Sequence, residues 1–245
     1  MDSSRNTKAI VLSRQDYREN DSLAVFYSLD YGKLALIARG AKKAGSKLVG
    51  HIEPLSVVDL MVINGKGRDY VGGVIAREQY LNLKKDLNAV YYAGLGVNWL
   101  RKMTEEGEAE PELFLLFSSY LDLLDSRAFE SLSKEEGDLL FAFFAFKLLA
   151  LIGYQPQVGS CLECRLPAKP GKNYFDLKSG GLVCADCFVK TPRLGQEFLI
   201  ISDNCVKLLR FILDNELEAS KKLKVDKKFV KEIVTLVKSF LTFRS

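Results

Sequence analysis

The chain has 245 residues, 48% hydrophobic and 27% charged, which suffices for one large domain or two smaller ones. This ordinary composition excludes disordered, collagen-like and low-complexity proteins. The chain has a single histidine, His51, which excludes a histidine-rich metal site, and its formal net charge is only +4.

The small net charge hides an uneven distribution along the chain. Residues 1–85 carry a net charge of +5 (14 basic, 9 acidic), whereas residues 86–160 carry −7 (5 and 12). Residues 161–197 carry +2 (6 and 4), and residues 198–245 carry +4 (10 and 6). Such asymmetry indicates a module that binds a polyanion, joined to a second part of different character.

The first 81 residues predict a small β-barrel. Short runs of β-forming residues alternate with turn signals, and a Gly72-Gly73 pair in the last run suggests a bulge or tight bend. Five short strands in this length favour a barrel of the OB type, although an SH3-like barrel has the same pattern. The predicted strands are Ala9–Leu12, Leu23–Tyr27, Leu34–Ala38, Val57–Ile63 and Tyr70–Ile75.

From residue 82 the hydrophobic period becomes helical. The first predicted helix has a repeating face formed by Leu87, Val90, Tyr91, Gly94, Leu95 and Asn98. A second helix begins near Pro111, and Ser133 with Glu136 forms a capping box before the apolar run 139–152, which Gly153 terminates. We therefore predict an α+β chain with an OB-fold DNA-binding domain at residues 1–81 and a helical domain at residues 82–245.

Two further helices are predicted near the end of the chain. Ser202 and Asp203 cap the first, which runs through Leu213. The second has one apolar stripe, made of Phe229, Ile233, Leu236, Val237 and Phe240.

Nothing at the start of the chain resembles a signal peptide, because the first eight residues are polar. The longest apolar run, Leu139–Ile152, is interrupted by Lys147 and is shorter than the ~20 residues that span a bilayer. We therefore expect a cytoplasmic protein whose cysteines are reduced.

Four cysteines carry the most specific chemical signal. Cys161 and Cys164 form one CxxC pair, Cys184 and Cys187 form another, and 19 residues separate the inner cysteines. This spacing is typical of a tetrahedral zinc ribbon, here a module at about residues 157–192 with a hairpin that turns at Gly180-Gly181. Four thiolates leave no open coordination position, so we predict one structural Zn²⁺. The fifth cysteine, Cys205, is expected to be a buried thiol.

A run of cations, from Lys33 to Lys47, lies in a stretch that has no acidic residue between Tyr31 and His51. Its centre is a Gly/Ala-rich loop, residues 38–47, which suits contact with a phosphate backbone without base readout. Tyr17, Tyr27 and Tyr31 are nearby aromatic side chains that offer stacking faces or pack in the barrel.

Catalytic motifs are not matched. The segment Gly40–Lys47 has Ser and Lys in the wrong order for a P-loop, and Gly94-Leu95-Gly96 does not continue as GxGxxG. His51 lies before Ile52 and Pro54 in a strand-like stretch, where a structural or surface role is expected.

The order of several short motifs resembles the RecO family of bacterial recombination mediators over nearly the whole chain. These motifs are the first strand followed by Tyr17-Arg18-Glu19-Asn20-Asp21, then Tyr31-Gly32-Lys33, Ala38-Arg39-Gly40-Ala41-Lys42-Lys43, Gly153-Tyr154-Gln155-Pro156 and the two cysteine pairs. A departure occurs at Ile52-Glu53-Pro54-Leu55, where the family often has Leu-x-Pro-Phe.

This resemblance implies an N-terminal OB-fold, a helical domain with an inserted zinc module, and a function without catalysis. It implies binding to single- and double-stranded DNA, annealing of complementary strands and, with RecR, loading of RecA onto strands coated by single-strand-binding protein (SSB), whose C-terminal tail the helical domain captures. We predict DNA contacts from Lys33, Arg39, Lys42, Lys43 and Lys47, together with Arg14, Arg18, Lys66 and Arg68.

Two alternatives to a DNA mediator stay open from the sequence. An RNA- or transcription-related protein also combines an OB barrel with a zinc ribbon. A metal-dependent nuclease would use turn carboxylates such as Glu19 and Asp21.

Overall fold

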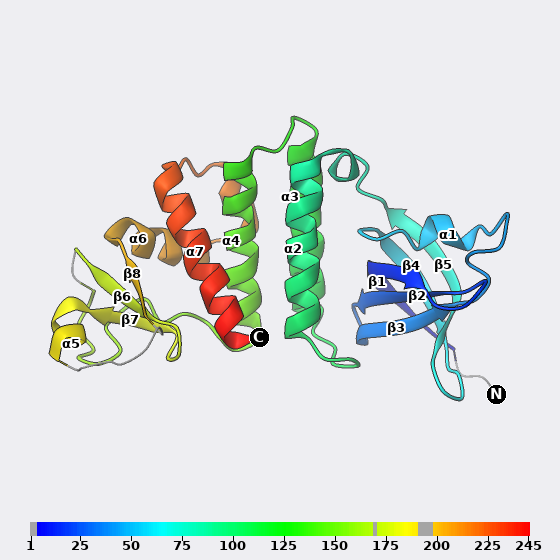
Figure 1. Cartoon of the computed structure of the whole chain (residues 1–245), viewed down its shortest axis with the longest axis horizontal. Coiled ribbons are helices and arrows are strands. Elements are labelled where there is room, and N and C mark those ends of the chain that lie inside the picture. Colours follow the sequence, from blue (N-terminus) through cyan, green and yellow to red (C-terminus); the bar gives the residue numbers. More distant parts are fainter. Residues whose placement is uncertain (1–3, 169–170, 191–197) are drawn as a thin grey trace. The chain divides into compact units, whose positions relative to one another are not determined.

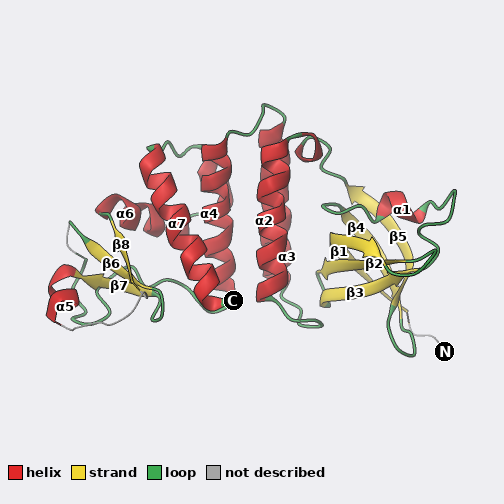
Figure 2. Ribbon diagram, in the orientation of Figure 1, coloured by secondary structure: helices red, strands yellow, loops and turns green. Residues whose placement is uncertain are grey.

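The computed structural model describes residues 4–168, 171–190 and 198–245, and Figures 1 and 2 show its helices and strands. The chain divides into two compact units, residues 1–132 and residues 133–245. The first unit contains the barrel and two long helices, and the second contains the other helices and the cysteine hairpin. The boundary predicted at residue 82 marks a change of secondary structure, and it stays a prediction.

The first unit begins with a closed barrel in the strand order β1-β2-β3-β5-β4, which confirms the OB-type prediction (Figure 2). Neighbouring strands are antiparallel except β3 and β5, which pair in parallel at Ile37 and Tyr70 and so close the barrel. The strands are β1 (Ser4–Asp16), β2 (Ser22–Ser28), β3 (Gly32–Ala38), β4 (Val57–Ile63) and β5 (Tyr70–Glu78).

The barrel interior is filled by side chains that alternate along each strand, including Val11, Phe26, Leu36, Leu60 and Val62. Met61 is opposite Gly73 and Val62 is opposite Val71, so Gly72 is the extra residue of a bulge, as predicted. A short helix, α1 (Leu48–His51), follows the basic loop. The strand-like prediction for His51 was therefore wrong, and its Nδ1 accepts a hydrogen bond from the backbone N–H of Ala76 at 3.2 Å.

A one-turn 3₁₀ helix, η1 (Leu83–Lys85), leads into α2 (Leu87–Met103) and α3 (Pro111–Ala128), which form a hairpin (Figure 1). The predicted helix is present as α2. The repeating face predicted for it is not its buried face, because Leu87 of that face is 89% exposed. Small residues determine the packing instead: a Cβ on Gly96 would lie 2.8 Å from the Tyr120 ring, so only glycine allows this approach. The buried face of α2 consists of Ala89, Tyr92, Ala93, Gly96, Trp99 and Leu100.

The second unit is built around α4 (Lys134–Leu151), which is buried on nearly all sides. The predicted capping box of Ser133 and Glu136 begins this helix, and Gly153, with φ of +88°, follows its end. The helices α6 (Asp203–Asp214) and α7 (Lys227–Arg244) and the 3₁₀ helix η2 (Leu217–Lys221) pack against it.

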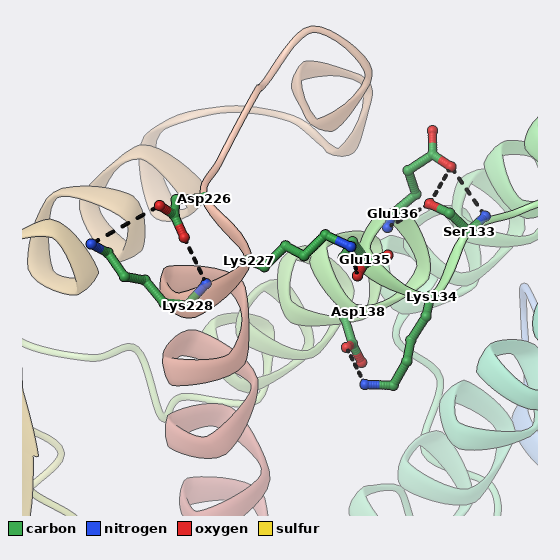
Figure 3. A network of polar contacts seen from close by, with 8 residues as sticks. All are labelled: Ser133, Lys134, Glu135, Glu136, Asp138, Asp226, Lys227 and Lys228. Carbon is green, nitrogen blue, oxygen red and sulfur yellow. Dashed lines mark hydrogen bonds and ion pairs between the residues drawn. The ribbon is translucent and has the colours of Figure 1, made fainter.

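Polar contacts link the N-terminal ends of α4 and α7 (Figure 3). Lys227 Nζ lies 2.6 Å from a Glu135 oxygen, and this hydrogen bond lowers the pKa of Glu135. At the start of α7, Asp226 accepts a hydrogen bond from the backbone N–H of Lys228. These exposed contacts help to fix where the two helices begin.

A small sheet of strand order β7-β6-β8 completes the second unit. It contains β6 (Asn173–Asp176), β7 (Gly181–Cys184) and β8 (Phe198–Ile201), and the helix α5 (Ala185–Lys190) follows β7. The hairpin turns at Gly180, with φ of +69°, as predicted. Among the described residues, no helix has the length and apolar character needed to cross a membrane.

Candidate metal centre and nucleic-acid interface

The four paired cysteines come together in space. The Sγ atoms of Cys161, Cys164, Cys184 and Cys187 all lie within 4.8 Å of one another, and those of Cys164 and Cys184 are 3.9 Å apart. Four sulfurs at ~2.3 Å from a central zinc ion are ~3.8 Å apart in a tetrahedron, so these positions suit a zinc ion. The structure thus confirms that the four cysteines can hold a metal ion.

Local backbone contacts shape the first cysteine pair into a tight turn. The N–H of Cys161 donates to the carbonyl of Leu166 at 2.9 Å, and the N–H of Arg165 donates back to the carbonyl of Cys161 at 3.0 Å. Arg165 has a positive φ of 61°, which lets the chain reverse directly after Cys164. The second pair lies at the end of β7 and in the first turn of α5.

The pKa values of two thiols in the cluster are shifted in opposite directions. Burial raises the pKa of Cys161, but the backbone N–H groups of Cys184, Cys164 and Glu163 outweigh burial and lower that pKa to about 6. A hydrogen bond with the Cys184 thiol is the main cause that raises the pKa of Cys187 to about 12. Cys161 and Cys187 therefore differ in how readily they ionise, whereas a divalent cation favours the thiolate form of each cysteine that binds it.

The basic loop, residues 39–47, is tied to the turn between β1 and β2. The N–H of Gly40 donates to the Asp21 carboxylate at 2.9 Å, and the N–H of Lys42 donates to the carbonyl of Asn20 at 3.0 Å. The predicted contacts Arg39, Lys42, Lys43 and Lys47 are all exposed on this loop.

The loop cations differ in their partners. Lys42 Nζ lies 2.9 Å from the carboxylate of Asp16, and the Arg39 guanidinium lies 4.0 Å from the centroid of the Tyr70 ring. Among the described residues, Lys43 and Lys47 make no ion pair. These two lysines are therefore the loop cations most available to a phosphate.

Lys33 lies apart from the loop. It is the second residue of β3 and Arg39 follows the end of that strand, so their backbones are about 20 Å apart at ~3.3 Å per residue. Its Nζ donates to the carbonyls of Arg101, at 2.9 Å, and of Thr104 at the end of α2. This ammonium therefore caps a helix end, and its predicted contact with DNA stays a prediction.

The other predicted contacts lie around the barrel. Arg14 donates to the carbonyl of Val49 at 2.9 Å, and the Arg18 guanidinium lies 5.1 Å from the Tyr17 ring centroid. Lys66 and Arg68 are exposed on the turn between β4 and β5.

The three tyrosines considered as stacking faces are not equivalent. Tyr27 is fully buried, and this burial raises its pKa to about 12, so it packs in the fold. Tyr17 is 40% exposed, and the Arg5 guanidinium lies 4.7 Å from the ring centroid of Tyr31. The contact between Tyr70 and Arg39 was not predicted, because it forms only where β3 and β5 close the barrel.

Two family models match this chain with its barrel, helices and cysteine cluster. The family model for the recombination protein O N terminal matches residues 1–76, and that for its C terminal matches residues 84–245. The chain belongs to the RecO family. The resemblance inferred from the motifs is thereby confirmed.

Curated RecO-family relatives align with nearly the whole chain. The DNA repair protein RecO of Geobacter metallireducens is 30% identical over 213 residues, which cover 86% of this chain and 83% of the relative. Those of Dehalococcoides mccartyi strain BAV1 and Alkaliphilus metalliredigens are 27% and 28% identical and cover 97% and 96% of this chain. They span 89% and 91% of those relatives. The chain is thus a member of a family of DNA repair proteins.

Proposed function

We propose that this RecO-family chain is a non-enzymatic mediator that binds single- and double-stranded DNA and anneals complementary strands. The observation that carries the proposal is the exposed set of cations on residues 39–47, fixed to the barrel by the Gly40–Asp21 and Lys42–Asn20 contacts. Such a loop neutralises phosphates without reading bases, and bound positive charge reduces repulsion between two strands.

We also propose one structural Zn²⁺ per chain, held by Cys161, Cys164, Cys184 and Cys187. The closed shell of four thiolates supports a structural role, because it leaves no position for water or substrate. In this role the ion stabilises the segment around the hairpin of β6 and β7.

The partners proposed from the family are RecR, RecA and SSB, with the protein acting on DNA in the cytoplasm at the nucleoid. A groove of about 370 Å³ between β8 and α7 offers a place for an acidic, apolar SSB tail. Leu199, Ile200 and Phe229 line the groove with apolar side chains, and Lys228 and Lys231 line it with Glu232, whose carboxylate accepts hydrogen bonds from Ser202. An apolar groove with two lysines complements a peptide that carries both characters.

The loop is tested by reversing three of its charges. The variant Arg39→Glu, Lys42→Glu, Lys43→Glu is expected to lose annealing and most DNA affinity, with unchanged circular dichroism and zinc content. A matched control reverses three exposed lysines of the second unit, Lys221, Lys222 and Lys224, and changes the net charge equally. Annealing with and without SSB, and binding measured by fluorescence anisotropy, are the readouts.

Three results would overturn the proposal. Unchanged DNA affinity in the loop variant would remove the loop from the interface. Binding to RNA without acceleration of DNA annealing would favour an RNA- or transcription-related function. Cleavage of labelled DNA with Mg²⁺ or Mn²⁺ would make the protein an enzyme.

A further inference from the structure

The outer face of β2 and β3, which many OB-folds use for oligonucleotides, is partly covered here by the first unit's own chain. Tyr27 on this face is fully buried, and its hydroxyl donates to the carbonyl of Glu110 at 3.4 Å. Lys33 on the same face donates to carbonyls at the end of α2. A Cβ on Gly32 would lie 1.9 Å from the carbonyl oxygen of Glu108, so the connection to α3 is in direct contact with β3. These contacts leave less of this face to a strand of nucleic acid and favour another part of the barrel.

The seam between β3 and β5 is the alternative, because it lies next to the basic loop. Ile37 pairs with Tyr70 there, and the N–H of Ile37 donates to the carbonyl of Asp69 at 3.1 Å. Arg39 follows two residues later, and its guanidinium lies 4.0 Å from the Tyr70 ring centroid. This contact fixes a planar cation on an aromatic ring, while the Arg39 residue as a whole stays exposed.

The neighbouring turn between β4 and β5 is also held in one conformation. The Asp69 carboxylate accepts a hydrogen bond from the N–H of Gly65 at 3.2 Å and forms an ion pair with Arg5 at 2.9 Å. Lys66 and Arg68 are exposed on this turn, directly before Tyr70. At this seam, the planar guanidinium of Arg39 lies over the Tyr70 ring, and further cations lie on the turn and on the basic loop.

We propose that an unpaired nucleobase stacks on the face of the Arg39 guanidinium opposite the Tyr70 ring. The proposal rests on the DNA binding proposed above and specifies how the barrel contacts a single strand. Phosphates on either side of that base then meet the loop 39–47 and the turn 64–69. A paired base in a duplex has no free face, so this contact belongs to single strands alone.

The other two Arg–Tyr pairs of the barrel are less suitable for this contact. Arg5 is held by Asp69, and its side chain is only 34% exposed. Arg18 lies 5.1 Å from the ring of Tyr17, which is its neighbour in sequence, so no second element positions this pair. Arg39, directly after β3, and Tyr70, the first residue of β5, are instead brought together by the closure of the barrel.

Two probes separate base stacking from phosphate binding. One is an oligothymidylate of about 15 nucleotides, within the usual site sizes of OB-folds, and the other is an abasic oligomer of the same length and charge. We expect the wild-type protein to bind the thymidylate at least about tenfold more tightly than the abasic strand. Arg39→Lys, which keeps the charge, and Tyr70→Leu should abolish most of this ratio, while Tyr70→Phe keeps it.

Two further variants serve as controls in this experiment. Lys43→Gln should weaken binding to both probes equally, and Tyr91→Leu, at a 53% exposed tyrosine of α2, should change neither. A wild-type ratio in both Arg39→Lys and Tyr70→Leu would overturn the stacking proposal while DNA binding stands. Failure of the wild-type protein to bind either probe would instead overturn the proposed function. Arg39→Lys changes no buried group, so its result does not depend on the folding of Tyr70→Leu.

Discussion

The cysteine cluster and the basic loop are both proposed to bind ligands, but their residues depend on one another in different ways. The four sulfurs lie within 4.8 Å of one another, so each is useful only when the other three are present. The cations of residues 39–47 lie on an exposed loop, and each neutralises a phosphate largely by itself. Loss of one residue should therefore abolish the first site and only weaken the second.

The largest expected effect follows loss of one metal ligand. Cys164→Ser should reduce zinc to well below one ion per chain and unfold the segment around β6 and β7. The apparent binding energy of a structural zinc ion, about 10–16 kcal/mol, matches or exceeds the stability of a typical domain. Native mass spectrometry and limited proteolysis give the readouts.

Cys205 supplies the control for this variant, because its thiol is fully buried in α6 and separate from the cluster. Cys205→Ala should lower stability slightly and keep the zinc. A full complement of zinc in Cys164→Ser would show that the four cysteines do not act as one site.

A smaller, graded effect is expected from the two unpaired lysines of the loop. Lys43→Gln and Lys47→Gln together should lower the slope of log affinity for single strands against log salt by about 1.4, since each phosphate contact contributes about 0.7. Each single variant should give about half of this change. A complete loss of binding in either single variant would mean that the loop residues act cooperatively, as the cysteines do.

The metal site was more fully predictable from the sequence than the basic loop, and the reason is physical. The cysteine spacing fixes its own geometry within a short segment, so the ligand set was predictable before the structure was known. The partners of a cation come from distant parts of the chain: Asp16 reaches Lys42 from β1, and helix carbonyls reach Lys33 from α2. Charge counts locate the basic segment but do not show which ammonium groups are available.

The helices show the same limit. All long helices were predicted from hydrophobic period and capping residues, yet the buried face of α2 was not. Its packing depends on Gly96, which admits the Phe117 and Tyr120 rings of α3 and contributes little to a hydrophobic pattern. The Arg39–Tyr70 contact was likewise inaccessible, because it depends on the parallel pairing of β3 with β5.

Lys33 provides the next test, in which a cation is expected to stabilise the fold. Lys33→Met keeps the apolar stem but removes the donor to the carbonyls of Arg101 and Thr104. We expect the free energy of unfolding to fall by about 1–3 kcal/mol, because these carbonyls lose a charged donor. Urea denaturation measures this change, and the salt slope of DNA binding should not move.

Lys42→Met is the matched control, because its ammonium pairs only with an exposed carboxylate and should change stability by less than about 1 kcal/mol. A drop of about 0.7 in the salt slope for Lys33→Met would instead place Lys33 among the phosphate contacts, as predicted from the sequence.

The smallest expected effect is a gain in affinity. Asp16→Asn removes the carboxylate that lies 2.9 Å from Lys42 Nζ and so makes this ammonium available to phosphate. Exposed ion pairs are worth about 1 kcal/mol or less, so affinity for single strands should rise by no more than about fivefold. Asp59→Asn is the control, because it frees Arg77 of β5 from Asp59 of β4, outside the loop, with the same change in net charge. Equal gains in both variants would mean that binding follows the net charge of the barrel, and the loop would then hold no special place in the interface.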